Sequence, residues 1–70
     1  MCEENVSKLT ERERQCLEMV SAGFTTPQAA AGLQIGERTV ETHISNAMRK
    51  LGVSTRAHAI AKAMRMGWLD

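Results

Sequence analysis

The sequence contains little cysteine, few aromatic residues and no long hydrophobic run. Its 70 residues include two cysteines, Cys2 and Cys16, without the spacing of a disulfide framework, so we expect both to be reduced thiols and Cys16 to lie in the core. No stretch approaches the roughly 18 consecutive apolar residues that a membrane helix needs. The first residues are acidic and polar, the reverse of a secretory signal. These absences predict a cytoplasmic protein with no membrane partner.

Residue groups typical of active sites and metal sites are also missing. Neither His43 nor His58 has a second histidine, a cysteine or a carboxylate at ligand spacing on its own helical face. We therefore expect His43 at the edge of the core. No nucleophile–base pair and no glycine-rich phosphate loop can be assembled from the sequence. It predicts a protein that is not an enzyme and that binds no cofactor, metal ion or small-molecule ligand.

Charge is small in sum but uneven along the chain. The net charge is +1, yet residues 1–18 carry five glutamates against three basic residues, and residues 19–34 carry no charge. Residues 35–70 carry six basic residues against three acidic ones. A polyanion would therefore be met by the second half of the chain.

The first predicted helix covers residues 10–22. Thr10 and Glu13 have the spacing of a capping box, in which each side chain satisfies a free backbone N–H of the first turn, and Glu13 is also expected to pair with Arg12. Apolar residues then recur at helical spacing, and they are Cys16, Leu17, Val20 and Phe24.

The second predicted helix covers residues 27–34 and consists mainly of small residues. Thr26 is expected as its N-cap, because Pro27 would then occupy the first helical position, where its missing N–H costs nothing. Small side chains allow a neighbouring helix to approach closely, as a helix-turn-helix requires.

The third predicted helix covers residues 37–51 and is amphipathic. One stripe at helical spacing is apolar and consists of Val40, Ile44, Ala47 and Leu51. The opposite face can donate and accept hydrogen bonds, and it consists of Arg38, Thr42, Ser45, Asn46 and Arg49. A short helix followed by a tight turn and an amphipathic helix describes a helix-turn-helix, whose second helix fits a major groove about 12 Å wide.

The fourth predicted helix covers residues 55–66, with Ser54 or Thr55 as its cap, and it is apolar over a wide arc. One edge of this arc should fill the core. The other edge is expected to remain exposed as a self-association surface, and it consists of Ala57, Ala61 and Met64. The alternative is that Trp68 and Leu69 fold back over this edge. The predicted architecture is thus all-α, with a flexible arm over residues 1–8 and one domain over residues 9–70.

The sequence as a whole resembles the LuxR-type (GerE-type) helix-turn-helix domain. The resemblance rests on blocks that occur in family order, namely Leu9-Thr10-x-Arg12-Glu13, Gly23-x-Thr25, Ala30-x-x-Leu33-x-Ile35, Thr39-Val40-x-x-His43-x-x-Asn46 and Lys50-Leu51-Gly52-Val53-x-x-Arg56-x-x-Ala59. It implies a transcription regulator that binds two DNA half-sites as a homodimer through its fourth helix. Family members often carry an upstream sensor, so the chain is either a stand-alone regulator or part of a longer one.

The resemblance and the helix pattern together give a set of DNA-contacting candidates. The base-contacting candidates are Arg38, Glu41, Thr42 and Ser45. The phosphate-contacting candidates are Thr25, Thr26, Thr39, Asn46, Arg49 and Lys50.

Three positions depart from the common family pattern. Glu41 stands where many members have lysine, and a carboxylate there repels phosphate but can accept a hydrogen bond from a cytosine amine. Gly36 replaces the usual serine before the third helix, so a cap hydroxyl is lost. Pro27 replaces a common lysine and removes one phosphate contact. Glu41, Pro27 and the low net charge leave an alternative open, in which the domain binds another regulator or RNA polymerase instead of DNA.

Overall fold

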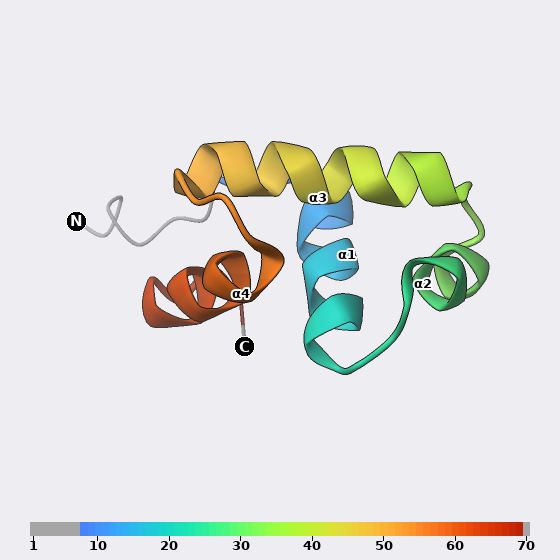
Figure 1. Ribbon diagram of the computed structural model, residues 1–70, viewed down its shortest axis with the longest axis horizontal. Helices are drawn as coiled ribbons and strands as arrows, with labels where there is room; N and C mark the ends of the chain where they lie inside the picture. The colour runs from blue at the N-terminus through green and yellow to red at the C-terminus, as the bar shows by residue number, and fades with distance from the viewer. Residues whose placement is uncertain (1–7, 70) are drawn as a thin grey trace.

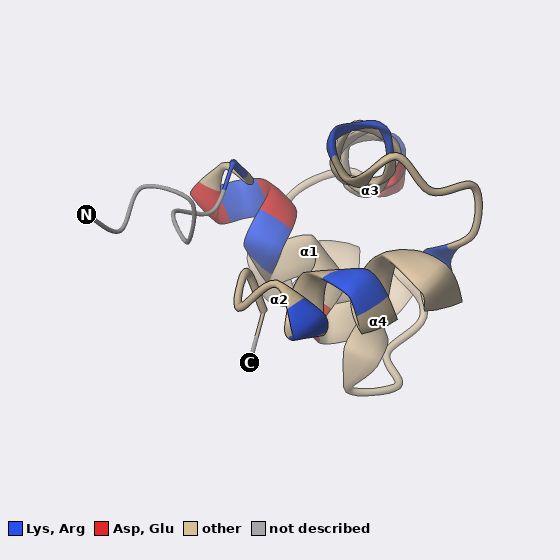
Figure 2. Cartoon of the chain, turned by 90° about the vertical axis from the view of Figure 1, so that its left-hand side faces the viewer, with Lys and Arg blue, Asp and Glu red and all other residues tan. Residues whose placement is uncertain are grey.

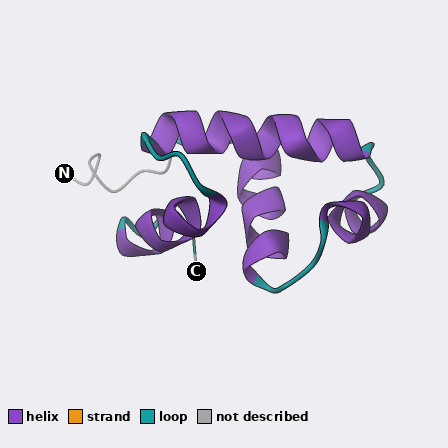
Figure 3. Ribbon diagram, viewed as in Figure 1, coloured by secondary structure: helices purple, strands orange, loops and turns teal. Residues whose placement is uncertain are grey.

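The computed structural model describes residues 8–69. Over this range the order of elements is α1 (Glu11–Ser21), α2 (Thr26–Leu33), α3 (Glu37–Leu51) and α4 (Arg56–Arg65). In Figure 1, α3 lies across one end of α1, and α2 and α4 lie on opposite sides of α1. No strand occurs in the described part of the chain (Figure 3). The all-α prediction is confirmed, and α3 has the predicted bounds.

Hydroxyl caps begin three of the four helices of this range. The predicted capping box of α1 is present, with the Glu13 N–H donating to Thr10 Oγ1 at 3.1 Å and the Thr10 N–H donating to Glu13 Oε1 at 3.0 Å. Thr55 caps α4 by accepting from the His58 N–H at 3.1 Å. Gly36 begins α3 without a side-chain cap bond, as its missing hydroxyl predicts.

The predicted cap of α2 is wrong by one residue. Thr25, not Thr26, is the N-cap, and it forms a capping box with Gln28 in which the Thr25 N–H donates to Gln28 Oε1 at 2.9 Å. This arrangement satisfies two backbone N–H groups at once. It also leaves the Thr26 hydroxyl free to bond elsewhere, and Pro27 becomes the second helical residue.

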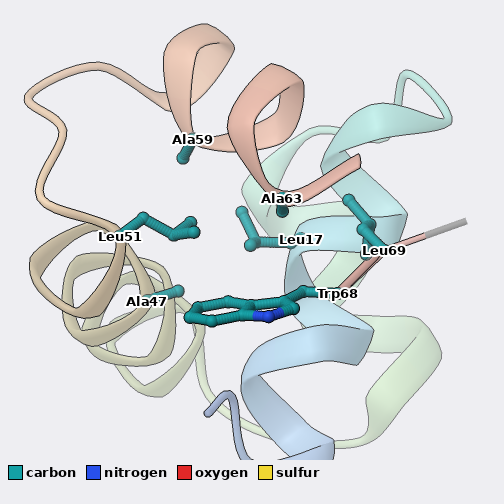
Figure 4. Close-up of a cluster of buried hydrophobic side chains, with 7 residues drawn as sticks. All are labelled: Leu17, Ala47, Leu51, Ala59, Ala63, Trp68 and Leu69. Atoms are coloured by element: carbon teal, nitrogen blue, oxygen red, sulfur yellow. The ribbon is translucent and has the colours of Figure 1, made fainter. Parts of the chain in front are cut away.

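Two clusters of buried side chains hold the helices together. The α4 cluster joins α1, α3, α4 and the segment after α4 (Figure 4), and it consists of Leu17, Ala47, Leu51, Ala59, Ala63, Trp68 and Leu69. The α2 cluster joins α1, α2 and α3, and it consists of Cys16, Ala29, Ala30, Val40 and Ile44. α2 packs closely on α1, because a Cβ added at Gly32 would lie only 2.9 Å from Met19 Cε.

Burial differs among the apolar residues that follow α1 and α4. Phe24 is not a core residue, because it lies in the turn after α1 and is 45% exposed. Trp68 and Leu69 pack in the α4 cluster and do not cover the exposed edge of α4. No helix within residues 8–69 is long and apolar enough to cross a membrane. The expected arm over residues 1–8, Lys8 excepted, and Cys2 lie outside the described residues.

Candidate nucleic-acid interface

The outer face of α3 is exposed and polar because its opposite face is anchored. Val40, Ile44 and Ala47 are at most 1% exposed, so the helix cannot rotate about its axis without leaving the core. The side of α3 away from the rest of the domain carries basic residues (Figure 2). The exposed residues predicted to contact DNA on this helix are Arg38, Thr39, Thr42, Ser45, Arg49 and Lys50. Glu41 is half-buried at one border of this face, and Asn46 is also half-buried.

The Arg38 and Arg49 guanidinium groups have no hydrogen-bond or ion-pair partner among residues 8–69. Thr42 and Ser45 lie between them on the same face, and their hydroxyls make no side-chain bond within the same range. Guanidinium groups suit guanine edges and phosphates, and short hydroxyl side chains suit base edges. The four side chains together therefore present free donors and acceptors on one rigid surface.

Glu41 is not free, although it lies beside this surface. Its Oε1 forms an ion pair with Arg56 Nη2, and its Oε2 accepts a hydrogen bond from Thr26 Oγ1 at 2.8 Å. The bonds from Arg56 and Thr26 hold the pKa of the Glu41 carboxyl below its usual range. The predicted base-contacting carboxylate is therefore ionised and already bonded within the domain.

Lys50, which was predicted to contact phosphate, is also bonded within the domain. Lys50 Nζ lies 2.8 Å from Glu13 Oε1 and donates to the Lys8 carbonyl oxygen at 3.2 Å. The Glu13 side chain is only 5% exposed, while that of Lys50 is 36% exposed. The expected Arg12–Glu13 pair is wrong: Arg12 Nη1 donates to Gln15 Oε1 at 3.1 Å, and Lys50 reaches Glu13 because α3 crosses the start of α1.

Two phosphate-contacting candidates lie at the start of α2. Thr25 is exposed, and its hydroxyl oxygen accepts the Gln28 N–H at 3.3 Å. Thr26 is half-buried, and its hydroxyl donates a hydrogen bond to Glu41. The capping box already uses the Thr25 and Gln28 N–H groups, and Pro27 has none, so the start of α2 offers an anion few free backbone donors.

The predicted self-association edge of α4 is exposed. Ala57, Ala61 and Met64 all lie at the surface, with Met64 46% exposed. Ala59 and Ala63, which alternate with them along the helix, are fully buried in the α4 cluster. The edge is thus an apolar surface on the side of α4 away from the core.

Sites of other kinds are not formed by residues 8–69. These residues contain no group of three or more histidine, cysteine, aspartate or glutamate side chains that could hold a metal ion, and they enclose no detectable pocket. His43 is half-buried, as expected for the edge of the core.

Sequence reasoning gave no role to Arg56, although it belongs to one of the family blocks. Its partners Thr26 and Glu41 are 30 and 15 residues away. Local periodicity carries no signal for contacts at that separation. The unusual carboxylate at position 41 was interpreted as an acceptor for cytosine and not as the partner of a cation.

Comparison with known proteins agrees with this geometry. Residues 7–63 match the family described as bacterial regulatory proteins, luxR family. The chain is 48% identical over 62 residues to the spore germination protein GerE of Bacillus subtilis (strain 168), which covers 89% of this chain and 84% of that protein. It is 45% identical over 62 residues to the probable transcriptional regulatory protein NarL of Mycobacterium tuberculosis (strain ATCC 25618 / H37Rv), covering 89% of this chain but 29% of that protein.

Solved structures show the same relationship. The structure of transcription factor GerE matches with a TM-score of 0.87 and 42% identity, over 93% of this chain and 97% of that one. The response regulator ChrA of a heme-sensing two-component system matches with a TM-score of 0.78 and 38% identity, over 86% of this chain and 30% of that one. The chain therefore belongs to the luxR family of bacterial regulatory proteins, a family of DNA-binding regulators of transcription.

Proposed function

We propose that the protein regulates transcription as a homodimer that reads two DNA half-sites, with α3 of each copy in a major groove. The observation that carries this proposal is the outer face of α3. Two guanidinium groups without a partner among residues 8–69 flank two hydroxyls there, and the carboxylate at the border of the face is already bonded to Arg56. A DNA backbone approaching α3 therefore meets free positive charge.

The proposed division of labour follows from position along α3. Arg38, Thr42 and Ser45 lie in the first two-thirds of the helix and are proposed to contact base edges, because the N-terminal residues of a recognition helix enter the groove most deeply. Arg49, in the last turn, is proposed to contact phosphate. Thr25, Thr39 and Asn46 are proposed as further phosphate ligands.

Thr26 and Lys50 were predicted for the same role, but both are engaged within the domain. To bind phosphate, Thr26 Oγ1 would have to leave Glu41 and Lys50 Nζ would have to leave Glu13. Each exchange replaces an existing bond instead of adding a new one. We therefore assign the phosphate contacts mainly to the unpartnered side chains.

The exposed edge of α4 is proposed as the homodimer contact. It is apolar, and closed two-fold association is the commonest way for such a surface to be covered by a second copy. A two-fold dimer would present two copies of α3 to successive half-sites on one side of the duplex. A cytoplasmic location is part of the same proposal, since the DNA partner lies there.

The alternative, a module that binds another regulator or RNA polymerase, has lost part of its support. It rested partly on Glu41 as a free negative charge that would repel DNA. Because Arg56 neutralises that carboxylate, the charge no longer argues against a polyanion. RNA polymerase remains a candidate second partner of a DNA-bound dimer.

Selection of binding sites from a randomised duplex pool, repeated at two salt concentrations, tests the proposal. We expect a palindromic motif whose binding weakens strongly with salt, because each phosphate contact releases counterions. Arg49→Ala should reduce affinity for all sequences alike and lower the salt slope by about 0.9 for each copy, or about 1.8 for the dimer. Arg65→Ala is the matched control, because Arg65 is an exposed arginine of α4 outside the proposed interface. Absence of any enriched motif at low salt would reject the DNA-reading function in favour of the protein-binding alternative.

A further inference from the structure

Three polar side chains from three different helices form a closed ring of hydrogen bonds. Thr26 of α2 donates from Oγ1 to Glu41 Oε2 at 2.8 Å. Arg56, the first residue of α4, donates from Nη1 to Thr26 Oγ1 at 3.4 Å, and its Nη2 pairs with Glu41 Oε1. Both carboxylate oxygens of Glu41 and both the donor and acceptor functions of the Thr26 hydroxyl are therefore used.

The ring joins parts of the fold that the core does not join. α2 and α4 lie on opposite sides of α1 (Figure 1). Each packs on α3 through a different group of buried residues, namely the α2 cluster and the α4 cluster. Through Arg56, the start of α4 is connected both to the start of α2 and to the first half of α3.

The bonds of Glu41 are unsuited to reading a base. A carboxylate recognises cytosine by accepting a hydrogen bond from its amine, and this requires an oxygen that is free to turn toward the groove. Here Arg56 and Thr26 hold one oxygen each. Arg56 is likewise held by two acceptors and does not project freely toward a phosphate.

We propose that Glu41 is a positioning residue, which fixes the start of α4 relative to α2 and α3 through Thr26 and Arg56. Ala57, the first residue of the proposed dimer edge, follows Arg56 directly. The direction of α4 determines how far apart the two copies of α3 lie in a dimer. The ring therefore sets the spacing of the half-sites, an inference that rests on the proposed function.

Glu41→Gln tests this proposal, because the amide keeps the size of the side chain but removes the charge and one acceptor. Glu37→Gln is the matched control, since Glu37 is an exposed glutamate one turn earlier on α3 with no side-chain partner among residues 8–69. Both variants change the net charge equally. Each is used to select from a pool in which the separation of two half-sites varies, and from a pool in which the half-site bases vary.

We expect the wild-type and Glu37→Gln chains to prefer one spacing. Glu41→Gln should lower that preference about two- to five-fold, the size expected for loss of an exposed ion pair, while selecting the same bases within each half-site. A changed base preference at any position would show that Glu41 reads DNA and would overturn the proposal. An unchanged spacing preference would overturn it as well.

A measurement without DNA keeps the inference separate from the proposed function. If the wild-type chain enriches no sequence, the proposed function fails. The effect of the ring on the position of α4 is then tested by the distance between two spin labels, one on Ala31→Cys of α2 and one on Arg65→Cys of α4. Both positions are exposed, Cys2 is replaced by serine, and buried Cys16 is not expected to label. In an excess of unlabelled chain, Glu41→Gln should broaden the distance distribution relative to Glu37→Gln. Identical distributions would overturn the proposal.

Discussion

Replacing Lys50 by methionine should destabilise the domain by about 2 kcal/mol. Methionine keeps most of the length of the side chain but removes the ammonium group that lies 2.8 Å from Glu13 Oε1. Loss of a hydrogen bond to a charged group costs about 1.5–3 kcal/mol, and breaking a buried ion pair costs about 3–5 kcal/mol. We take the lower range because the Lys50 side chain is 36% exposed, so water can partly replace it beside the carboxylate.

Urea unfolding of the two chains measures this loss directly. Circular dichroism reports the helices, and the fluorescence of Trp68, the only tryptophan, reports the α4 cluster. Arg49→Met is the control, because Arg49 is exposed and has no partner among residues 8–69, and it should change stability by less than about 0.5 kcal/mol. In a chain of this size, 2 kcal/mol corresponds to a decrease of about 8–16 °C in Tm.

The reasoning would be refuted by a Lys50→Met chain as stable as the Arg49→Met chain. The pH dependence gives an independent check. Burial raises the pKa of the Glu13 carboxyl, but the bonds from Lys50 and from the Thr10 N–H lower it more, so it lies below its usual range. The stabilisation from ionised Glu13 is therefore present above about pH 4.3 and is lost as the pH falls through the lower, folded-state pKa. The difference between the wild-type and Lys50→Met chains should shrink over that acid range.

Four further predictions concern α3, the α4 edge and two glycines. Thr42→Ala should alter the selected bases more than the overall affinity, which site selection measures; an unaltered profile would count against its place in the groove. Ala61→Glu should shift sedimentation equilibrium from dimer to monomer with little change in stability, because Ala61 is exposed. Gly52→Ala should cost about 1 kcal/mol in urea unfolding, since φ is +71° there. Gly36→Ser should instead gain about 0.5 kcal/mol, because φ of −75° suits serine and its hydroxyl can cap α3.

Local signals explain why much of the fold could be predicted from the sequence. The bounds of α3 follow from an apolar stripe at helical spacing that ends at Gly52, and both features involve residues close together in the chain. The caps at Thr10 and Thr55 are likewise set within three residues. The prediction failed at α2, where Thr25 and Thr26 are both suitable caps. The choice depended on Gln28 and on a distant acceptor for the Thr26 hydroxyl.

Contacts between distant residues explain what could not be predicted. Lys50 and Glu13 are 37 residues apart, and nothing in the local pattern of either identifies the other. Arg12 was the nearer cation and was therefore the natural but wrong choice.

The burial of Phe24 was predicted wrongly for a different reason. Phe24 fits the apolar spacing of α1, but the helix ends at Ser21 and the following turn carries Phe24 to the surface.

The same two ion pairs change how the charge of the chain should be interpreted. Glu41 lies on α3, and in the fold Glu13 lies beside Lys50 near the end of α3, so both would oppose a polyanion if they were unpaired. In the fold each carboxylate is paired with a basic residue from another element, Arg56 or Lys50. These two cations are consequently unavailable as free charge, and the outer face depends on Arg38 and Arg49. A net charge of +1 is therefore compatible with DNA binding, because the free positive charge on α3 depends on which residues are paired and not on their sum.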